Sequence, residues 1–200
     1  MKPWLALARM IDAINRFVGA VIIWFVLAAV LISAGNAVLR KVFNIGSNAY
    51  LELQWYLFAA VFLLGAGYTF LRNAHVRIDF VSTRLSPRAR NWVDILGIVV
   101  FVMPLTLILI GLSWPLVINA WVSGEMSQNA GGLVRWPVFA LLPAGMTLLL
   151  AQAISELIKR VAFLRGVGAD SIPEEHDPVA ASLIAEPSLI AEPAPAERAR

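Results

Sequence analysis

The residues best suited to chemistry lie in one short stretch, RNAHVRIDF at 72–80, which holds Arg72, His75, Arg77 and Asp79. Such a dense polar cluster directly behind a long apolar run raises the question of whether it is a chemical site. The rest of the chain offers no support for catalysis, because it has no cysteine, no HExxH or GxxxxGK[ST] pattern and no nucleophile beside a base. The sequence therefore predicts no catalytic residue, no metal site and no cofactor.

The composition indicates that this chain is solvated by lipid. Hydrophobic residues make up 60% of it, charged residues 14%, and the mean hydropathy is +0.76, whereas soluble domains are nearer half apolar and a quarter charged. Several apolar runs reach the roughly 20 residues that a helix needs to cross the hydrocarbon core. These runs lie at about 17–39, 49–71, 92–122 and 136–158. The sequence predicts an all-α integral membrane protein with four transmembrane helices, the third kinked at Pro104 and Pro115.

Lysines and arginines gather on one side of the predicted spans, and this bias predicts the orientation. Eleven of them precede the first span, join the second to the third, or follow the fourth: Lys2, Arg9, Arg16, Arg72, Arg77, Arg84, Arg88, Arg90, Lys159, Arg160 and Arg165. The other side has three: Arg40, Lys41 and Arg135. Both termini are therefore expected in the cytoplasm, and the first apolar run is expected to be a retained helix rather than a cleaved signal peptide.

The two ends of the chain differ from the four-helix domain, which is expected at 17–165. Residues 1–16 place three charges on one helical stripe, which fits either an amphipathic helix in the membrane interface or an extension of the first span. Residues 166–200 form an acidic, proline-rich tail with a repeated SLIAEP, a composition typical of disorder.

Polar side chains also mark the outer ends of the first two spans. Arg40 ends the first span and Glu52 begins the second, so they could form an ion pair or be two separately solvated charges. Glu52, Trp55 and Tyr56 share a helical face. That face could contact another protein, or its aromatic residues could belong to the belt that lines membrane interfaces.

The loop between the third and fourth spans, SGEMSQNAGGLVRWP at 123–137, is rich in small polar residues. Its candidate interface residues are Glu125, Ser127, Asn129, Gly131, Gly132 and Trp136. Paired glycines permit unusual backbone angles. The loop could therefore be a flexible connector, or it could be a shaped loop that contacts a partner on the outer face.

The end of the predicted fourth span carries a further set of charges. Glu156 stands three and four residues before Lys159 and Arg160, which is the spacing of ion pairs within a helix. We expect ordinary pairing at a helix end there rather than a functional site.

Four stretches together carry a resemblance to a known family: RKVFNIGSNAYLELQWYLFAAVFLLGAGYTFLRNAHVRIDF at 40–80, RLSPRARNWVDILG at 84–97, GEMSQNAGGLVRWPVFALLPAG at 124–145 and LLLAQAISELIKR at 148–160. They resemble the DctQ type of small membrane subunit in tripartite ATP-independent periplasmic (TRAP) transporters. The run E-x-S-x-N-x-G-G-L at 125–133 is similar to the branch labelled mannitol/chloroaromatic.

This resemblance implies a scaffold role in the bacterial inner membrane. A DctQ-type subunit pairs with a large DctM-type permease, which holds the substrate and sodium sites, while a soluble DctP-type periplasmic receptor delivers the solute. The implied activity is uptake of an organic acid or related anion, driven by an ion gradient through an elevator-like machine, with no substrate-binding residue on this chain. A scaffold of an unrelated complex is the main alternative, and a membrane enzyme or independent carrier is another.

If the chain is such a scaffold, RNAHVRIDF is expected to have a structural role. Arg77 and Asp79 would fix the short cytoplasmic connection, Arg72 would contact lipid phosphates, and His75 would donate to a carbonyl or carboxylate. The alternative is a simple topology signal at a helix end. The structural role is favoured because Asp79 adds nothing to a positive-inside signal.

Overall fold

The computed structural model describes residues 2–44, 46–72 and 86–167, and these residues are almost entirely helical. The elements are α1 (Lys2–Phe43), α2 (Asn48–Leu71), α4 (Pro87–Gly97), the π-helical turn η1 (Ile98–Val102), α5 (Met103–Ser123) and α6 (Trp136–Leu164). Four stretches are long and apolar enough to cross a membrane: α1, α2, the continuous run Pro87–Ser123, and α6. The predicted all-α class with four spans is confirmed. Residues 168–200 of the predicted tail lie outside the described residues.

Helix α1 is a single helix of 42 residues that contains both the N-terminal segment and the first apolar run. Its buried stripe consists of Ala8, Ile11, Asp12, Asn15, Gly19, Ile22 and Ala29. From Ala8 onward this stripe repeats about every 3.5 residues, which is the spacing of a coiled-coil seam. The stripe begins inside residues 1–16, so this segment packs with the bundle as an extension of the first long helix.

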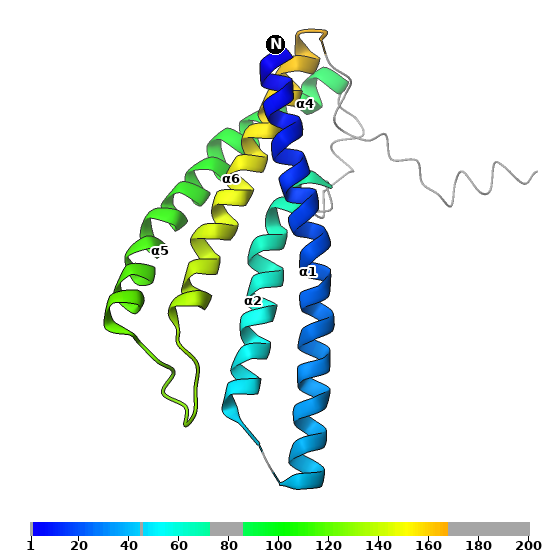
Figure 1. Cartoon of the computed structure of the whole chain (residues 1–200). Helices are drawn as coiled ribbons and strands as arrows, with labels where there is room; N and C mark the ends of the chain where they lie inside the picture. Colours follow the sequence, from blue (N-terminus) through cyan, green and yellow to red (C-terminus); the bar gives the residue numbers. More distant parts are fainter. Residues whose placement is uncertain (1, 45, 73–85, 168–200) are drawn as a thin grey trace, which may run out of the picture.

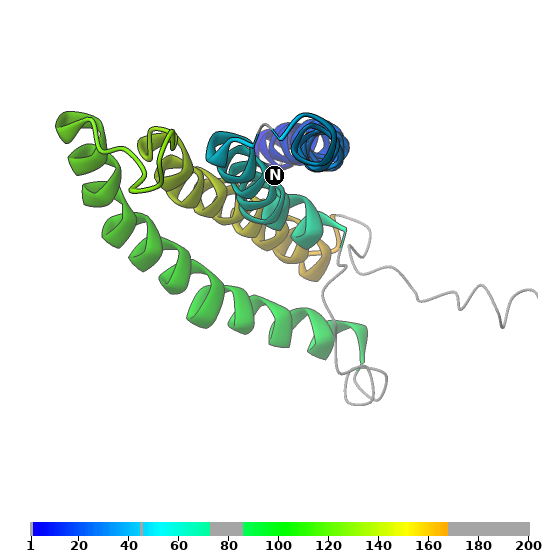
Figure 2. The same ribbon diagram turned by 90° about the horizontal axis from the view of Figure 1, so that it is seen from below.

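Helix α6 is the central element of the bundle. It packs against α1, α2, α4 and α5, while α1 also packs along α2. Figure 1 shows these helices running side by side along the long axis of the molecule. Seen along that axis, α5 lies on the far side of α6 from α1 (Figure 2). Because α5 rests chiefly on α6, most of its surface faces outward.

Glycines allow the helix backbones to approach closely. A Cβ atom added to Gly145 of α6 would lie 2.6 Å from the carbonyl carbon of Leu63 on α2. A Cβ atom added to Gly67 of α2 would lie 3.2 Å from the carbonyl carbon of Leu148 on α6. Small residues at such crossings are how helices associate in lipid, where burial of apolar surface between helices gains little. The α2–α6 contact therefore depends on the absence of these two side chains.

The third span changes its helical geometry next to Pro104. The π-helical turn η1 ends two residues before this proline, and the amide of Met103 donates to the carbonyl of Ile98. The Thr106 hydroxyl then lies 2.9 Å from the carbonyl oxygens of both Val102 and Met103. A π turn beside a proline is a recognised cause of helix bending, and Figure 2 shows this span as a curved rod. Helix α5 continues through the second proline, Pro115.

The glycine contact predicts a sharp difference between two single substitutions. Gly145→Ala adds a methyl group against the backbone of Leu63 and should lower the free energy of unfolding by about 1–3 kcal/mol. Gly35→Ala is the matched control, because nothing lies within 4 Å of a Cβ atom at that helical position. Thermal unfolding of the purified chain in detergent measures both. Equal midpoints for the two variants would contradict the close α2–α6 approach.

Candidate functional site

The first polar cluster lies where α2 begins, around the carboxylate of Glu52; we call it the loop cluster. Glu52 Oε1 accepts hydrogen bonds from the Ser127 hydroxyl and from Asn129 Nδ2, the latter at 2.7 Å. Glu52 Oε2 accepts from the backbone amide of Leu133 at 2.7 Å. One carboxylate thus gathers three donors from a loop about 80 residues away in sequence, which fixes that loop on the end of α2.

The loop itself has a defined shape. Gly124 ends α5 in the left-handed conformation, with φ 62°. Met126 and Val134 then form an isolated antiparallel bridge. The amide of Gly132 donates to the carbonyl of Asn129 at 2.9 Å, closing a tight turn in which Gly131 has φ 72°. A positive φ favours glycine there. The loop is therefore a small closed hairpin and not a loose connector.

Further contacts fasten this hairpin to α2 and to its own base. The Tyr56 hydroxyl donates to the carbonyl of Val134 at 3.1 Å, and Asn48 Nδ2 donates to that of Ala130 at 3.1 Å. At the base of the loop, the rings of Trp121 and Trp136 pack edge to face with centroids 4.7 Å apart.

Charged side chains within the loop pair with each other rather than with Glu52. Arg135 Nη1 lies 2.6 Å from Glu125 Oε1. The loop is therefore shaped, and its observed contacts are with α2 of the same chain; the contact with a partner on the outer face stays a prediction.

The suggested Arg40–Glu52 ion pair is not formed in the described part of the chain. Arg40 is exposed at the end of α1, and the loop supplies three donors to Glu52 at short range. The shared face proposed for Glu52, Trp55 and Tyr56 is also divided. Glu52 and Tyr56 hold the loop, whereas Trp55 is 74% exposed. Trp55 borders an open pocket of about 410 Å³ together with Asn129.

The second cluster lies at the opposite end of the bundle, between the start of α1 and the end of α6; we call it the terminal cluster. Asp12 Oδ1 accepts from Gln152 Nε2 at 2.9 Å and from the Ser155 hydroxyl at 2.7 Å. Gln152 Oε1 in turn accepts from Asn15 Nδ2 at 2.9 Å. All four side chains are buried, so these contacts replace water for polar groups that would otherwise be costly to enclose.

Charged residues extend the terminal cluster to a third helix. Lys159 Nζ lies 3.2 Å from Asp12 Oδ2 and also contacts Glu156 Oε1. Arg160 Nη1 lies 2.7 Å from Asp94 Oδ2 on α4 and its Nη2 lies 3.7 Å from Glu156 Oε2. Arg160 is only 1% exposed. The predicted pairing within the helix is confirmed, but it is part of a network that joins α1, α4 and α6.

Sequence reasoning missed Asp12, Gln152 and Asp94 as members of one site. The available signal was weak: Asp12 is the only acid in residues 1–16, and Asp94 is the only acid in residues 86–97. Neither spacing nor hydropathy reveals that the two carboxylates meet cations from the same turn of α6.

The RNAHVRIDF stretch is described only at its start. Arg72 is exposed, and its Nε donates to the Tyr68 hydroxyl at 3.2 Å. His75, Arg77 and Asp79 lie outside the described residues. Within residues 2–44, 46–72 and 86–167, no group of three or more histidine, cysteine or acidic side chains could hold a metal ion. The arrangement of both clusters suits the joining of helices rather than bond-making chemistry.

Comparison with known proteins gives one family match. The family model described as the DctQ component of tripartite ATP-independent periplasmic transporters matches residues 29–163. No curated protein and no solved structure matches the chain. The matched region runs from the middle of α1 to the end of α6, so it includes all of the α2, α5 and loop-cluster residues described above.

The loop cluster predicts that Glu52→Gln will loosen the hairpin. A glutamine side chain offers one acceptor oxygen in place of two, so its amide group would face either the Leu133 amide or the donors of Ser127 and Asn129. Hydrogen exchange at the Leu133 amide should become several-fold faster. Glu125→Gln is the matched control, because it removes one charge from the same loop but spares Glu52. Unchanged exchange in Glu52→Gln would contradict the carboxylate's role.

The terminal cluster predicts a large cost for removing Arg160. Arg160→Met leaves Glu156 buried beside an apolar side chain, and breaking a buried pair in this way costs about 3–5 kcal/mol of stability. Arg16→Met serves as the control, because Arg16 is exposed on α1. The measurement is thermal unfolding in detergent. A midpoint for Arg160→Met as high as that of the control would show that these buried ion pairs do not stabilise the bundle.

Proposed function

The chain belongs to the DctQ family of tripartite ATP-independent periplasmic transporters, and from this premise we propose that it scaffolds the large DctM-type permease of such a transporter. The observation that carries the proposal is the match over residues 29–163, which includes the last part of α1, the second and third spans, and nearly all of α6. The chain would act as the fixed part of the machine, and the substrate and ion sites would lie on the permease.

The positions of the charged residues favour a scaffold role rather than conduction of ions or solutes. The apolar runs 17–39, 53–71, 98–122 and 136–155 contain no charged residue. Proton relays and ion paths normally need ionisable groups at that depth. The ionisable groups that are buried in the described structure belong to the terminal cluster, at one end of the bundle, where they join helices.

An extensive apolar surface supports contact with a membrane partner and with lipid. Exposed large side chains on the third span include Phe101, Leu105, Ile108, Leu112, Trp114 and Trp121. Because α5 packs chiefly on α6, this face is available to a second chain. A soluble protein rarely exposes so large an apolar patch.

The solute, the coupling ion and the receptor that we propose are those typical of the family. The transporter would take up an organic acid or related anion, use a sodium gradient and receive its solute from a DctP-type periplasmic receptor, within the mannitol/chloroaromatic branch. Both termini would lie in the cytoplasm, as the lysine and arginine bias favours. The terminal cluster and RNAHVRIDF would then face the cytoplasm, and the loop cluster, with the exposed Trp55, would face the periplasm.

Purification from native membranes tests the proposal directly. The full chain, tagged at its C-terminus and extracted in mild detergent, should recover a large polytopic permease in about equal amount. A mock-tagged membrane protein of similar size is the control for non-specific recovery. Recovery of this chain alone, folded and stable, would contradict the scaffold role and would call for a transport assay of the chain in liposomes.

A further inference from the structure

We propose that the end of the bundle that holds the terminal cluster also carries a binding site for the phosphate headgroup of an anionic phospholipid. Lys2, Arg9 and Lys159 form this site. The site is an open pocket of about 420 Å³ between α1 and α6, and Leu5 and Ala8 complete its lining. It is separate from the loop cluster. The proposal requires only that the helices cross a membrane, so it stands or fails independently of the transporter assignment.

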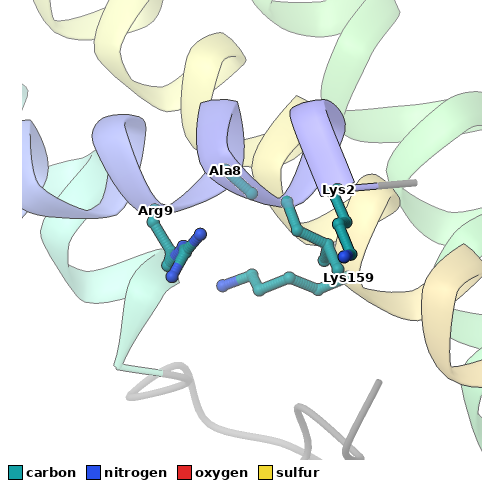
Figure 3. A pocket seen from close by; sticks show the side chains of 5 residues that line it. Lys2, Ala8, Arg9 and Lys159 are labelled. Atoms are coloured by element: carbon teal, nitrogen blue, oxygen red, sulfur yellow. The ribbon is translucent and has the colours of Figure 1, made fainter. Parts of the chain in front are cut away.

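The cations that line this pocket come from two helices. Lys2 and Arg9 are seven residues apart on α1, which places them on the same helical face two turns apart. Lys159 extends from α6 across the pocket toward the guanidinium of Arg9 (Figure 3). A phosphate that carries one negative charge and several acceptor oxygens matches such a set of donors.

The charge of the pocket is only partly compensated within the chain. The ammonium of Lys159 already contacts Asp12 and Glu156. Lys2 and Arg9, in contrast, form no ion pair within the described residues, and both are exposed. Three cations thus face two carboxylates, both of them largely buried, which leaves the pocket with a net positive charge for an outside anion.

The position of the pocket along the membrane normal matches that of the lipid headgroup layer. The uncharged run 136–155 of α6 has 20 residues, which rise about 30 Å and so equal the hydrocarbon core. Lys159 follows Ser155 by four residues, or about 6 Å along the axis. Headgroups add roughly 5–8 Å on each side of the core. The apolar side chain of Leu5 can then lie against the glycerol and upper acyl carbons while the cations hold the phosphate.

Two features favour lipid over a soluble anion. The pocket is open-sided and borders the apolar surface of α1 and α6, so that acyl chains can continue along the helices. A second, smaller pocket of about 250 Å³ is also lined by residues from the start of α1 and the end of α6: Trp4, Leu157, Ile158, Val161 and Arg165. An aromatic ring and an arginine at the same level are typical of a protein surface at the membrane interface.

Native mass spectrometry of the full chain in neutral detergent tests the site. Titration with dioleoyl phosphatidylglycerol should show one retained lipid that binds more tightly than dioleoyl phosphatidylcholine. Each cation near an anionic lipid surface strengthens binding roughly fivefold. The double variant Lys2→Gln/Arg9→Gln should therefore weaken phosphatidylglycerol binding about 25-fold. Arg40→Gln/Lys41→Gln is the matched control, because it removes the same charge from exposed residues at the other end of α1; it should retain wild-type affinity.

Several results would overturn the proposal. One is equal loss of lipid in the two double variants, which would indicate a general charge effect. Another is full competition by millimolar inorganic phosphate, which would indicate a soluble phosphate site. A third is lipid retention only after deletion of residues 170–200, which would show that the acidic end of the chain occupies the pocket instead. Since Lys2 and Arg9 are exposed and have no ion partner among the described residues, their replacement should not disturb folding, and thermal unfolding checks this.

Discussion

The hydrogen bonds from Gln152 and Ser155 to the carboxylate of Asp12 set the relation between the first and last long helices. Helices surrounded by lipid gain little from burying apolar side chains against each other, so polar contacts and close packing must define their register. Asp12 can satisfy its oxygens in only one register, because its donors occupy successive turns on one face of α6. Sliding α1 by one turn would leave several buried groups without partners, and that is costly in a medium without water.

The same region of α6 then positions the third span. Arg160 follows Glu156 by one turn and reaches Asp94 at the start of that span. At the opposite end, the loop that joins α5 to α6 is fastened to α2 by Glu52. Polar contacts therefore close the bundle at both ends, and between them Gly67 and Gly145 bring α2 and α6 together. The terminal cluster joins α1, α4 and α6, whereas the loop cluster joins α2 to the loop that connects α5 and α6.

The sequence predicted the number and order of long helices because hydropathy and length depend on each segment alone. It also predicted that Glu156 would pair with Lys159 and Arg160, since that spacing is local. It did not predict the contacts of Asp12 or Asp94, because their partners lie more than 60 residues away and depend on how the helices pack. Glu52 shows the same limit. Arg40 was the partner suggested by the sequence, yet amide and hydroxyl donors of a distant loop surround the carboxylate in space.

A bundle fastened in this way is suited to resist shear. If the proposed partner moves a solute by displacing one of its parts across the membrane, the stationary part must not follow that movement. Four apolar helices held only by packing could slide or separate, because dispersion contacts have little directional preference. Carboxylates held by several donors at opposite ends oppose both motions, since either motion would strip charged groups of their partners. The middle of the spans contains no charged residue, and their outer faces are therefore free to contact lipid and a second chain.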